Sequence, residues 1–225
     1  MKLNPLRALK AFYSLARLVR DPNRLDEVFE MSDALATKEA LGPIVERLAE
    51  DPVVARSLEE RHRIRVDLAA LRRLPEGTLG RTFAEHMFAA NLDPAALPDL
   101  ASDDPIAFFR AHLYETHDIW HVVTGFGTDL VGELGLQAFY LAQIPGPLPA
   151  LLVAVGFVRS GLVDDTLTVP FMDALVRGWR MGRSAAPLFG VKWDELWELP
   201  VREVRAKLGV DASDVAAGGV SALAA

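Results

Sequence analysis

The sequence predicts an all-α protein, a single multi-helix domain of about ten helices with an apolar cavity. Strand signals are weak, because no run of alternating β-branched residues stands between turn pairs. Signals for helix starts are frequent. Four prolines stand where helices could begin, and three of them follow an aspartate that could cap the helix; the prolines are Pro22, Pro52, Pro105 and Pro200. Hydrophobic residues make up 51% of the chain, enough for a large core with apolar material left over for a lipid-like ligand.

Apolar periodicity between these stops places each helix in order. We expect helices near residues 5–20, 24–36, 39–50, 52–60, 78–91, 105–124, 129–142, 147–161, 168–183 and 200–208. The segment 61–77 is expected to be a connection, and Trp193 and Trp197 are expected to anchor a short C-terminal helix. The helical domain should therefore cover residues 1–210, with residues 211–225, rich in Ala, Gly and Ser, as a flexible tail.

Charge and composition exclude several classes of function. The net charge of −7 argues against general nucleic-acid binding, which needs a basic face for phosphates. Because the chain has no cysteine, it has no disulfide, thiolate metal site or cysteine nucleophile. The most apolar stretch, 148–158, has eleven residues, fewer than the roughly 20 that cross a bilayer, so we expect no transmembrane segment.

The start of the chain is a basic amphipathic segment that precedes the first acidic residue, Asp21. Its basic residues are Lys2, Arg7, Lys10, Arg17 and Arg20. Three interpretations stay open: a helix that contacts a membrane surface, a cleaved organellar presequence, or a first core helix with a solvated basic edge.

The strongest chemical signal is the sequence His117-Asp118-Ile-Trp-His121 near the end of a helix that begins at Asp104 and Pro105. At about 100° per residue, His117, Asp118 and His121 occupy an arc of roughly 100°, so their heads can converge. His117 is expected to face the interior, because it continues an apolar stripe. That stripe consists of Ile106, Phe109, Leu113 and Trp120. A metal ion would satisfy all three buried polar groups together.

A fourth ligand, Glu133, is expected from the next helix. Residues 125–128, Gly-Phe-Gly-Thr, supply a helix stop and a new cap, so the chain can double back. The stretch 130–142 is apolar almost all round, which is typical of a buried helix, and Glu133 is its only charged side chain. Gly132 and Gly135 beside it would let another backbone or a ligand come close.

Two imidazoles with one or two carboxylates suit zinc and also resemble a non-haem iron(II) triad, and the spacing does not choose between them. Such a site could activate water, polarise a carboxylate or phenolate oxygen, or bind dioxygen. The alternative is an ordinary helix pair of histidines with Asp118 bonded locally. His86 and His112 are expected to be ordinary helix residues, and Asp164 and Asp165 are expected to cap the helix that follows them.

These residues resemble the Coq4 family of ubiquinone biosynthesis proteins, whose hallmark is His-Asp-x-x-His followed by a glutamate. The metal motif here is His117, Asp118, His121 and Glu133. The likeness also covers DPNRLDEVFEMSDALATKEAL, LEERHRI, LPEGTLGRTFAEHMFAANLDP and GWRMGRSAAPLFGVKWDELWELPVREVRAKLGV, in family order. One departure is His62, because the family usually has proline between these two arginines.

The resemblance implies a metal-dependent decarboxylase or hydroxylase with one divalent metal ion, zinc or iron(II). The implied reaction replaces the C1 carboxyl of a polyprenylated hydroxybenzoate by a hydroxyl. Arg61 and Arg63 could bind the acidic head group. The implied partners are an isoprenoid lipid or quinone precursor, other ubiquinone biosynthesis proteins and a membrane surface; a homo-oligomer stays open. We expect a bacterial cytoplasmic protein, peripheral on the inner face of the inner membrane, or on the matrix side if eukaryotic.

Two other functions compete with this enzyme. One is a non-catalytic scaffold that binds isoprenoid lipid and organises the quinone biosynthetic complex, its metal being structural. The other is a metal phosphohydrolase, which is weaker because no histidine follows His121 to supply further ligands.

Overall fold

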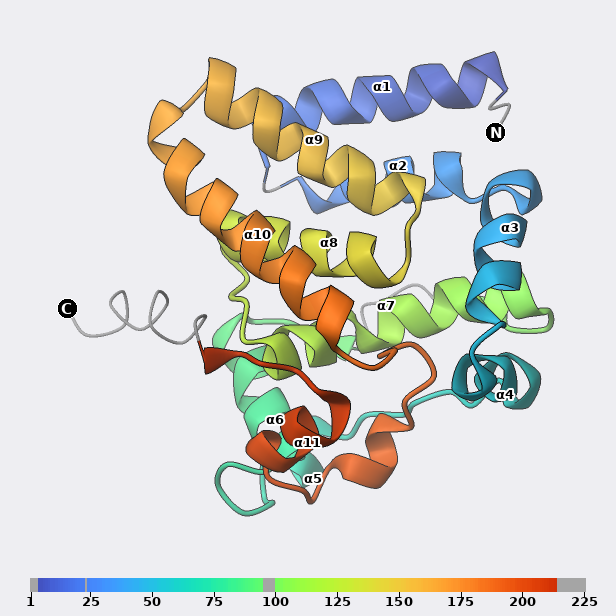
Figure 1. The fold of residues 1–225 in the computed structure, drawn as a ribbon, viewed down its shortest axis with the longest axis vertical. Helices are drawn as coiled ribbons and strands as arrows, with labels where there is room; N and C mark the ends of the chain where they lie inside the picture. Colours follow the sequence, from blue (N-terminus) through green and yellow to red (C-terminus); the bar gives the residue numbers. More distant parts are fainter. Residues whose placement is uncertain (1–3, 23, 95–99, 214–225) are drawn as a thin grey trace. The chain divides into compact units, whose positions relative to one another are not determined.

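The structure is a computed structural model that describes residues 4–22, 24–94 and 100–213 (Figure 1). Within these ranges the chain forms helices and no strand beyond one isolated bridge between Thr78 and Pro200. The all-α prediction is therefore confirmed. The chain divides into two compact units, and each unit is assembled from two stretches that lie far apart in the sequence.

The first unit comprises Met1–Arg47 and Asp129–Arg183. Its helices are α1 (Pro5–Arg20), α2 (Leu25–Leu35), α3 (Lys38–Leu48), α8 (Leu130–Gln143), α9 (Pro147–Leu162) and α10 (Thr168–Ser184), with a 3₁₀ turn η2 (Asp165–Leu167). Helix α1 packs on α2 and α9, and these three helices share one apolar cluster. The buried members of this cluster are Ala11, Leu18, Met31, Ala34, Leu35 and Val155.

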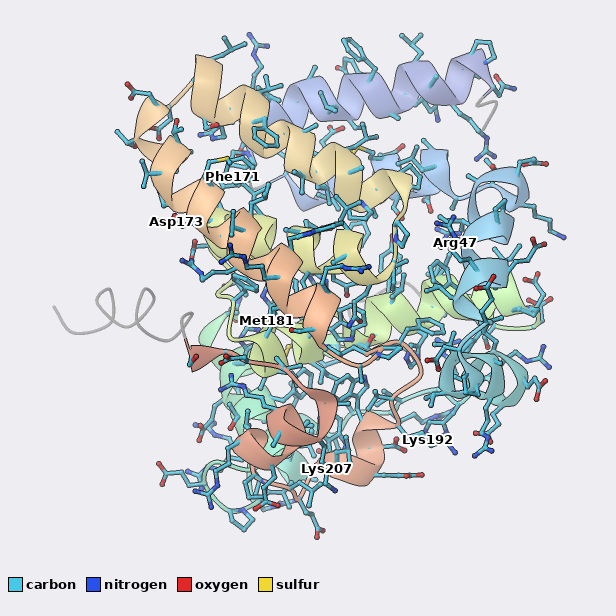
Figure 2. All side chains as sticks on the ribbon, in the orientation of Figure 1. Arg47, Phe171, Asp173, Met181, Lys192 and Lys207 are labelled. Carbon is cyan, nitrogen blue, oxygen red and sulfur yellow. The ribbon has the colours of Figure 1, made fainter. Side chains whose placement is uncertain are left out.

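Helices α8 and α10 approach each other through glycines. A Cβ built on Gly178 would overlap the carbonyl oxygen of Gly135, and one built on Gly182 would lie 2.7 Å from the carbonyl oxygen of Phe139. Only residues without side chains permit backbones this close. The close approach predicted at Gly135 is confirmed, and its partner is α10. Figure 2 shows Phe171 and Asp173 on the same helix; Phe171 is buried and Asp173 is exposed.

The second unit comprises Leu48–Thr128 and Ser184–Ala225. Its helices are α4 (Pro52–Glu60), α5 (Leu68–Leu71), α6 (Leu79–Ala89), α7 (Pro105–Thr124) and α11 (Val201–Leu208), with a 3₁₀ turn η3 (Trp193–Leu196). Helix α7 is the centre of this unit, since α4, α6 and α11 all pack against it. Trp120 and Trp193 are fully buried, and Trp197 stacks on Phe83 with ring centroids 5.5 Å apart.

Each predicted helix is present, with ends that differ by a few residues. Three details were wrong. Helix α2 begins at Leu25, three residues after Pro22, so this proline does not occupy a first helical position. The segment 61–77 contains the short helix α5, and the cap of α8 is Asp129, just beyond the predicted 125–128 turn. Of the predicted tail, residues 214–225 lie outside the described part of the chain.

Candidate metal centre

Helix α7 carries three of the predicted ligands, and both of its ends are fixed by local hydrogen bonds. The carboxylate of Asp104 accepts from the amides of Ile106 and Ala107 at 2.8 and 2.9 Å. At the other end, Gly125 adopts the left-handed conformation with φ 83°, which favours glycine. The guanidinium of Arg205 donates to the carbonyls of residues 122 and 123, which lack helical partners.

The side chains of His117, Asp118 and His121 converge at the C-terminal end of α7. One ligand atom from each residue lies within 4.8 Å of the others. His121 is 1% exposed, whereas His117 and Asp118 are half-buried, so the more deeply buried imidazole is His121 rather than the predicted His117. The predicted convergence of the three residues is present in the structure.

Hydrogen bonding defines which nitrogen of His121 is available as a ligand. Its Nδ1 lies 3.0 Å from the carbonyl oxygen of Phe126 and must carry the proton, since a carbonyl only accepts. Its Nε2 therefore presents a lone pair, and it lies 3.3 Å from Nε2 of His117. A backbone carbonyl that orients the far nitrogen of a histidine is the usual support of a metal ligand.

The donor set fits a divalent metal. Two nitrogens bound to one zinc at about 2.0–2.1 Å with a tetrahedral angle lie about 3.4 Å apart. The measured separation of the two Nε2 atoms is 3.3 Å. His117, Asp118 and His121 could therefore hold such an ion with little rearrangement, and zinc and iron(II) both accept this ligand chemistry.

His86 on α6 is a neighbour of this site that the sequence did not indicate. Its ring stacks on the ring of His121 with centroids 5.8 Å apart and an interplanar angle of 24°. The ring of His117 meets the same imidazole edge-on at 4.8 Å. The sequence shows His86 only as one polar residue in an amphipathic helix, and no spacing rule connects α6 to a motif on α7.

Glu133, the fourth predicted ligand, lies in the first turn of α8 and belongs to the first unit. Its side chain is half-buried in a helix whose other described side chains are mostly buried and apolar. Asp129 caps the helix by accepting from the amides of Val131 and Gly132 at 3.0 and 3.1 Å. The ligand role of Glu133 stays a prediction.

Arg61 and Arg63, the predicted head-group residues, have partners within the second unit. Arg63 donates to Glu115 at 2.7 Å and to the carbonyl of Leu100 at 2.9 Å. Arg61 donates to the carbonyl of Asp103 at 3.2 Å. Both arginines thus connect the segment after α4 to residues around α7, so binding a substrate anion would require them to share or exchange these contacts. Their substrate role also stays a prediction.

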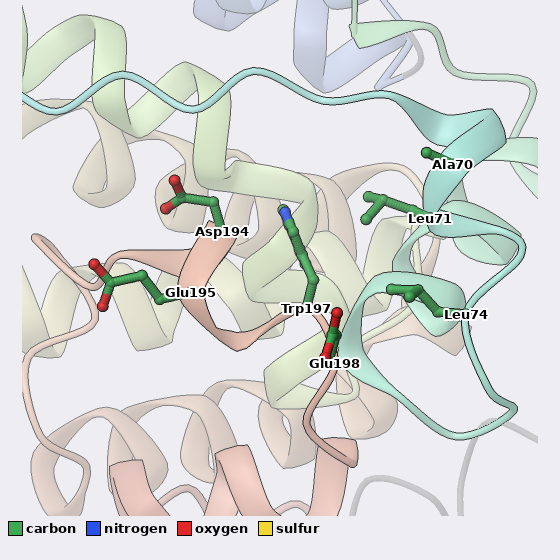
Figure 3. A pocket seen from close by; sticks show the side chains of 7 residues that line it. All are labelled: Ala70, Leu71, Leu74, Asp194, Glu195, Trp197 and Glu198. Atoms are coloured by element: carbon green, nitrogen blue, oxygen red, sulfur yellow. The ribbon is translucent and has the colours of Figure 1, made fainter.

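A hollow of about 360 Å³ lies between α5 and η3 (Figure 3). Its lining residues are Ala70, Leu71, Leu74, Asp194, Glu195, Trp197 and Glu198. Figure 3 shows Asp194 and Glu195 on one side of Trp197 and Leu71 and Leu74 on the other, with Glu198 next to Trp197 on the side of Leu74. Asp194 accepts from His62, whose Nε2 lies 2.8 Å away, so the departure from the family's proline supplies a contact to η3. No predicted ligand or head-group residue lines this hollow.

The described chain is thus an all-α protein whose longest helix carries a His-Asp-His group able to hold a metal ion. The family model described as "Coenzyme Q (ubiquinone) biosynthesis protein Coq4" matches residues 2–214, so the chain belongs to the Coq4 family. The resemblance found in the sequence is confirmed, and the family places the protein in ubiquinone biosynthesis.

Known relatives support the same family. The mitochondrial ubiquinone biosynthesis protein coq4 of Aspergillus fumigatus is 30% identical over 196 residues, which is 85% of this chain and 68% of that protein. The human homologue, also named mitochondrial, is 27% identical over 96% of this chain and 82% of its own length. A crystal structure of a Nostoc punctiforme protein named for ubiquinone biosynthesis superposes with a TM-score of 0.78 at 35% identity, covering 90% and 97% of the two chains.

Proposed function

We propose that this protein is a metal-dependent enzyme of ubiquinone biosynthesis that removes the C1 carboxyl of a polyprenylated hydroxybenzoate and installs a hydroxyl in its place. The overall conversion takes one dioxygen and two reducing equivalents, and it releases carbon dioxide and water. The observation that supports this proposal is the His117-Asp118-His121 group, whose ligand atoms converge within 4.8 Å. A divalent ion bound there would supply positive charge for the substrate carboxylate or phenolate.

The proposed ligand set is His117, Asp118, His121 and Glu133. Glu133 is included because it is the only charged side chain of α8, and a half-buried carboxylate among apolar residues is costly unless a cation is near. We propose zinc or iron(II) as the metal. In this proposal Arg61 and Arg63 bind the acidic head group in exchange for part of their present contacts.

We propose that the protein acts on a membrane surface, where it meets isoprenoid substrates and the other ubiquinone biosynthesis proteins. None of the described helices is long and apolar enough to cross a bilayer. Helix α1 buries Ala11 and Leu18 against its unit but leaves four large side chains 60–68% exposed beside its basic residues. The four exposed residues are Leu6, Leu9, Phe12 and Tyr13. An apolar stripe beside basic side chains suits anionic lipid at the inner face of a membrane.

Metal analysis and turnover by variants test the enzyme proposal together. Protein purified without chelator or affinity tag should contain one zinc or iron per chain. His121→Ala and Glu133→Ala should lose this metal, stay folded, still bind lipid and form no hydroxylated product from the carboxylated intermediate. His112→Gln is a matched control, because His112 is a buried histidine of the same helix outside the ligand set. It should keep both metal and activity.

The competing functions predict other results. A structural metal in a lipid-holding scaffold predicts that the two alanine variants lose folding or assembly rather than turnover alone. Continued turnover of the carboxylated intermediate by both alanine variants would exclude the enzyme proposal. Metal-dependent release of phosphate from a monophosphate ester would favour the phosphohydrolase instead.

A further inference from the structure

We propose that His86 is a positioning residue for the metal centre: its ring holds the imidazole of His121 in the orientation in which Nε2 faces the metal. This inference rests on the proposed metal site and adds a residue that the family motif does not contain. The observation that carries it is the stacking of the two rings, with centroids 5.8 Å apart and planes inclined by 24°.

His121 is constrained by contacts of three different kinds. Its Nδ1–H donates to the carbonyl of Phe126 at 3.0 Å, which fixes one edge of the ring. The ring of His117 lies at 88° to it with centroids 4.8 Å apart, and the nearly parallel ring of His86 lies beside it with centroids 5.8 Å apart. A single hydrogen bond still allows an imidazole to rock about its χ2 torsion, whereas neighbouring rings packed beside it limit that motion.

The helix that carries His86 is itself firmly placed. Its first amides donate outside the helix, from Leu79 to the carbonyl of Leu199 at 2.8 Å and from Gly80 to the carbonyl of Trp197 at 2.9 Å. Phe83 stacks on Trp197, and the next residue to His86, Met87, is 2% exposed. Helix α6 packs directly on α7, so the ring of His86 on α6 can limit the motion of the ring of His121 on α7.

His86 contributes a ring rather than a ligand atom in this arrangement. The atoms that converge for a metal belong to His117, Asp118 and His121. Residues that orient a ligand without touching the metal typically change metal affinity by 10–100-fold when they are altered. The ring of His86 is therefore expected to affect affinity through the orientation of His121, and an aromatic ring without nitrogen should suffice.

Two substitutions separate the ring from its nitrogens. His86→Phe keeps an aromatic face, and its zinc affinity should stay within about threefold of the unaltered protein. His86→Leu keeps apolar volume without a ring, and zinc should bind about tenfold more weakly. Met87→Leu is the control, because it repacks the adjacent buried residue of the same helix and should leave affinity unchanged once the folded fraction is matched by circular dichroism.

A measurement on metal-free protein keeps this inference distinct from the metal proposal. Imidazole ¹⁵N NMR should find the proton of His121 on Nδ1 in the unaltered protein and in His86→Phe, with a mixture of tautomers in His86→Leu. Equal zinc binding and an unchanged His121 tautomer in His86→Leu would overturn the positioning role. An equal loss of zinc affinity in His86→Phe and His86→Leu would overturn it too, since the effect would then depend on the nitrogens of His86 and not on its ring. If the unaltered protein binds no metal, the proposed function fails, while the tautomer result still decides the role of His86.

Discussion

Lowering the pH is expected to destabilise the protein through His112, which lies on α7 five residues before His117. Burial lowers the pKa of His112 to about 4, and the positive charges of His62 and Arg63 act in the same direction. Its Nε2 accepts from the amide of Gly190 at 3.3 Å. The single proton of the neutral ring is then on Nδ1, which is buried without a hydrogen-bond partner among the described residues. A second proton on Nε2 would oppose the Gly190 N–H.

The size of the effect follows from the two pKa values. The folded value of about 4 lies below the ordinary value of 6.5, so the unfolded chain takes up the proton first as the pH falls. The stabilisation is therefore complete above the unfolded pKa and is lost as the pH falls toward the folded one. Between pH 7 and pH 5, this one group should remove about 2 kcal/mol from the free energy of unfolding.

Urea unfolding at pH 7 and pH 5, compared between the unaltered protein and His112→Gln, measures this contribution. Glutamine can still accept from Gly190 but does not titrate, so the variant should lose about 2 kcal/mol less over the same interval. The carboxylates titrate in both proteins and cancel in the comparison. Parallel pH dependences of the two proteins would show that His112 does not titrate as its burial requires.

Two further pairs of substitutions test the contacts that stabilise each unit. Gly178→Ala should lower the free energy of unfolding by about 3 kcal/mol in thermal or urea unfolding, because its Cβ would meet the backbone of α8. Gly161→Ala, with open space around the new methyl group, should instead stabilise by about 0.5–1 kcal/mol. Arg205→Met should lower the free energy of unfolding by about 2 kcal/mol, because it removes two charged hydrogen bonds from the end of α7. Arg202 is exposed, so Arg202→Met should change the free energy of unfolding by less than about 0.5 kcal/mol.

The helices were predictable because their start signals act locally. Asp51 and Asp104 each precede a proline, and in the structure each carboxylate caps the helix that this proline begins. Asp164 likewise accepts from the amide of Thr166, as predicted for a cap. Helix α5 was missed because four residues are too short to display an apolar period. The division into two units was not visible, since it depends on which distant segments pack together.

The candidate site was predictable only as far as one helix extends. His117, Asp118 and His121 follow from helical spacing, because side chains three and four residues apart share a face. The carbonyl of Phe126 and the ring of His86 come from a turn and from another helix, so no period in the sequence connects them to the motif. The pairing of Arg63 with Glu115 at 2.6 Å was likewise not visible in the sequence, because the two residues lie far apart along the chain.

The glycines of α8 and α10 form a backbone contact that the sequence predicted only in part. The sequence indicated that something approaches α8 at Gly135, because a missing side chain leaves room beside the backbone. It could not indicate what fills that room, which the structure shows to be Gly178 of α10. Gly182, one turn later, continues the same contact against Phe139. Two glycines four residues apart thus fix the register of α8 on α10, and with it the direction of Glu133 within its unit.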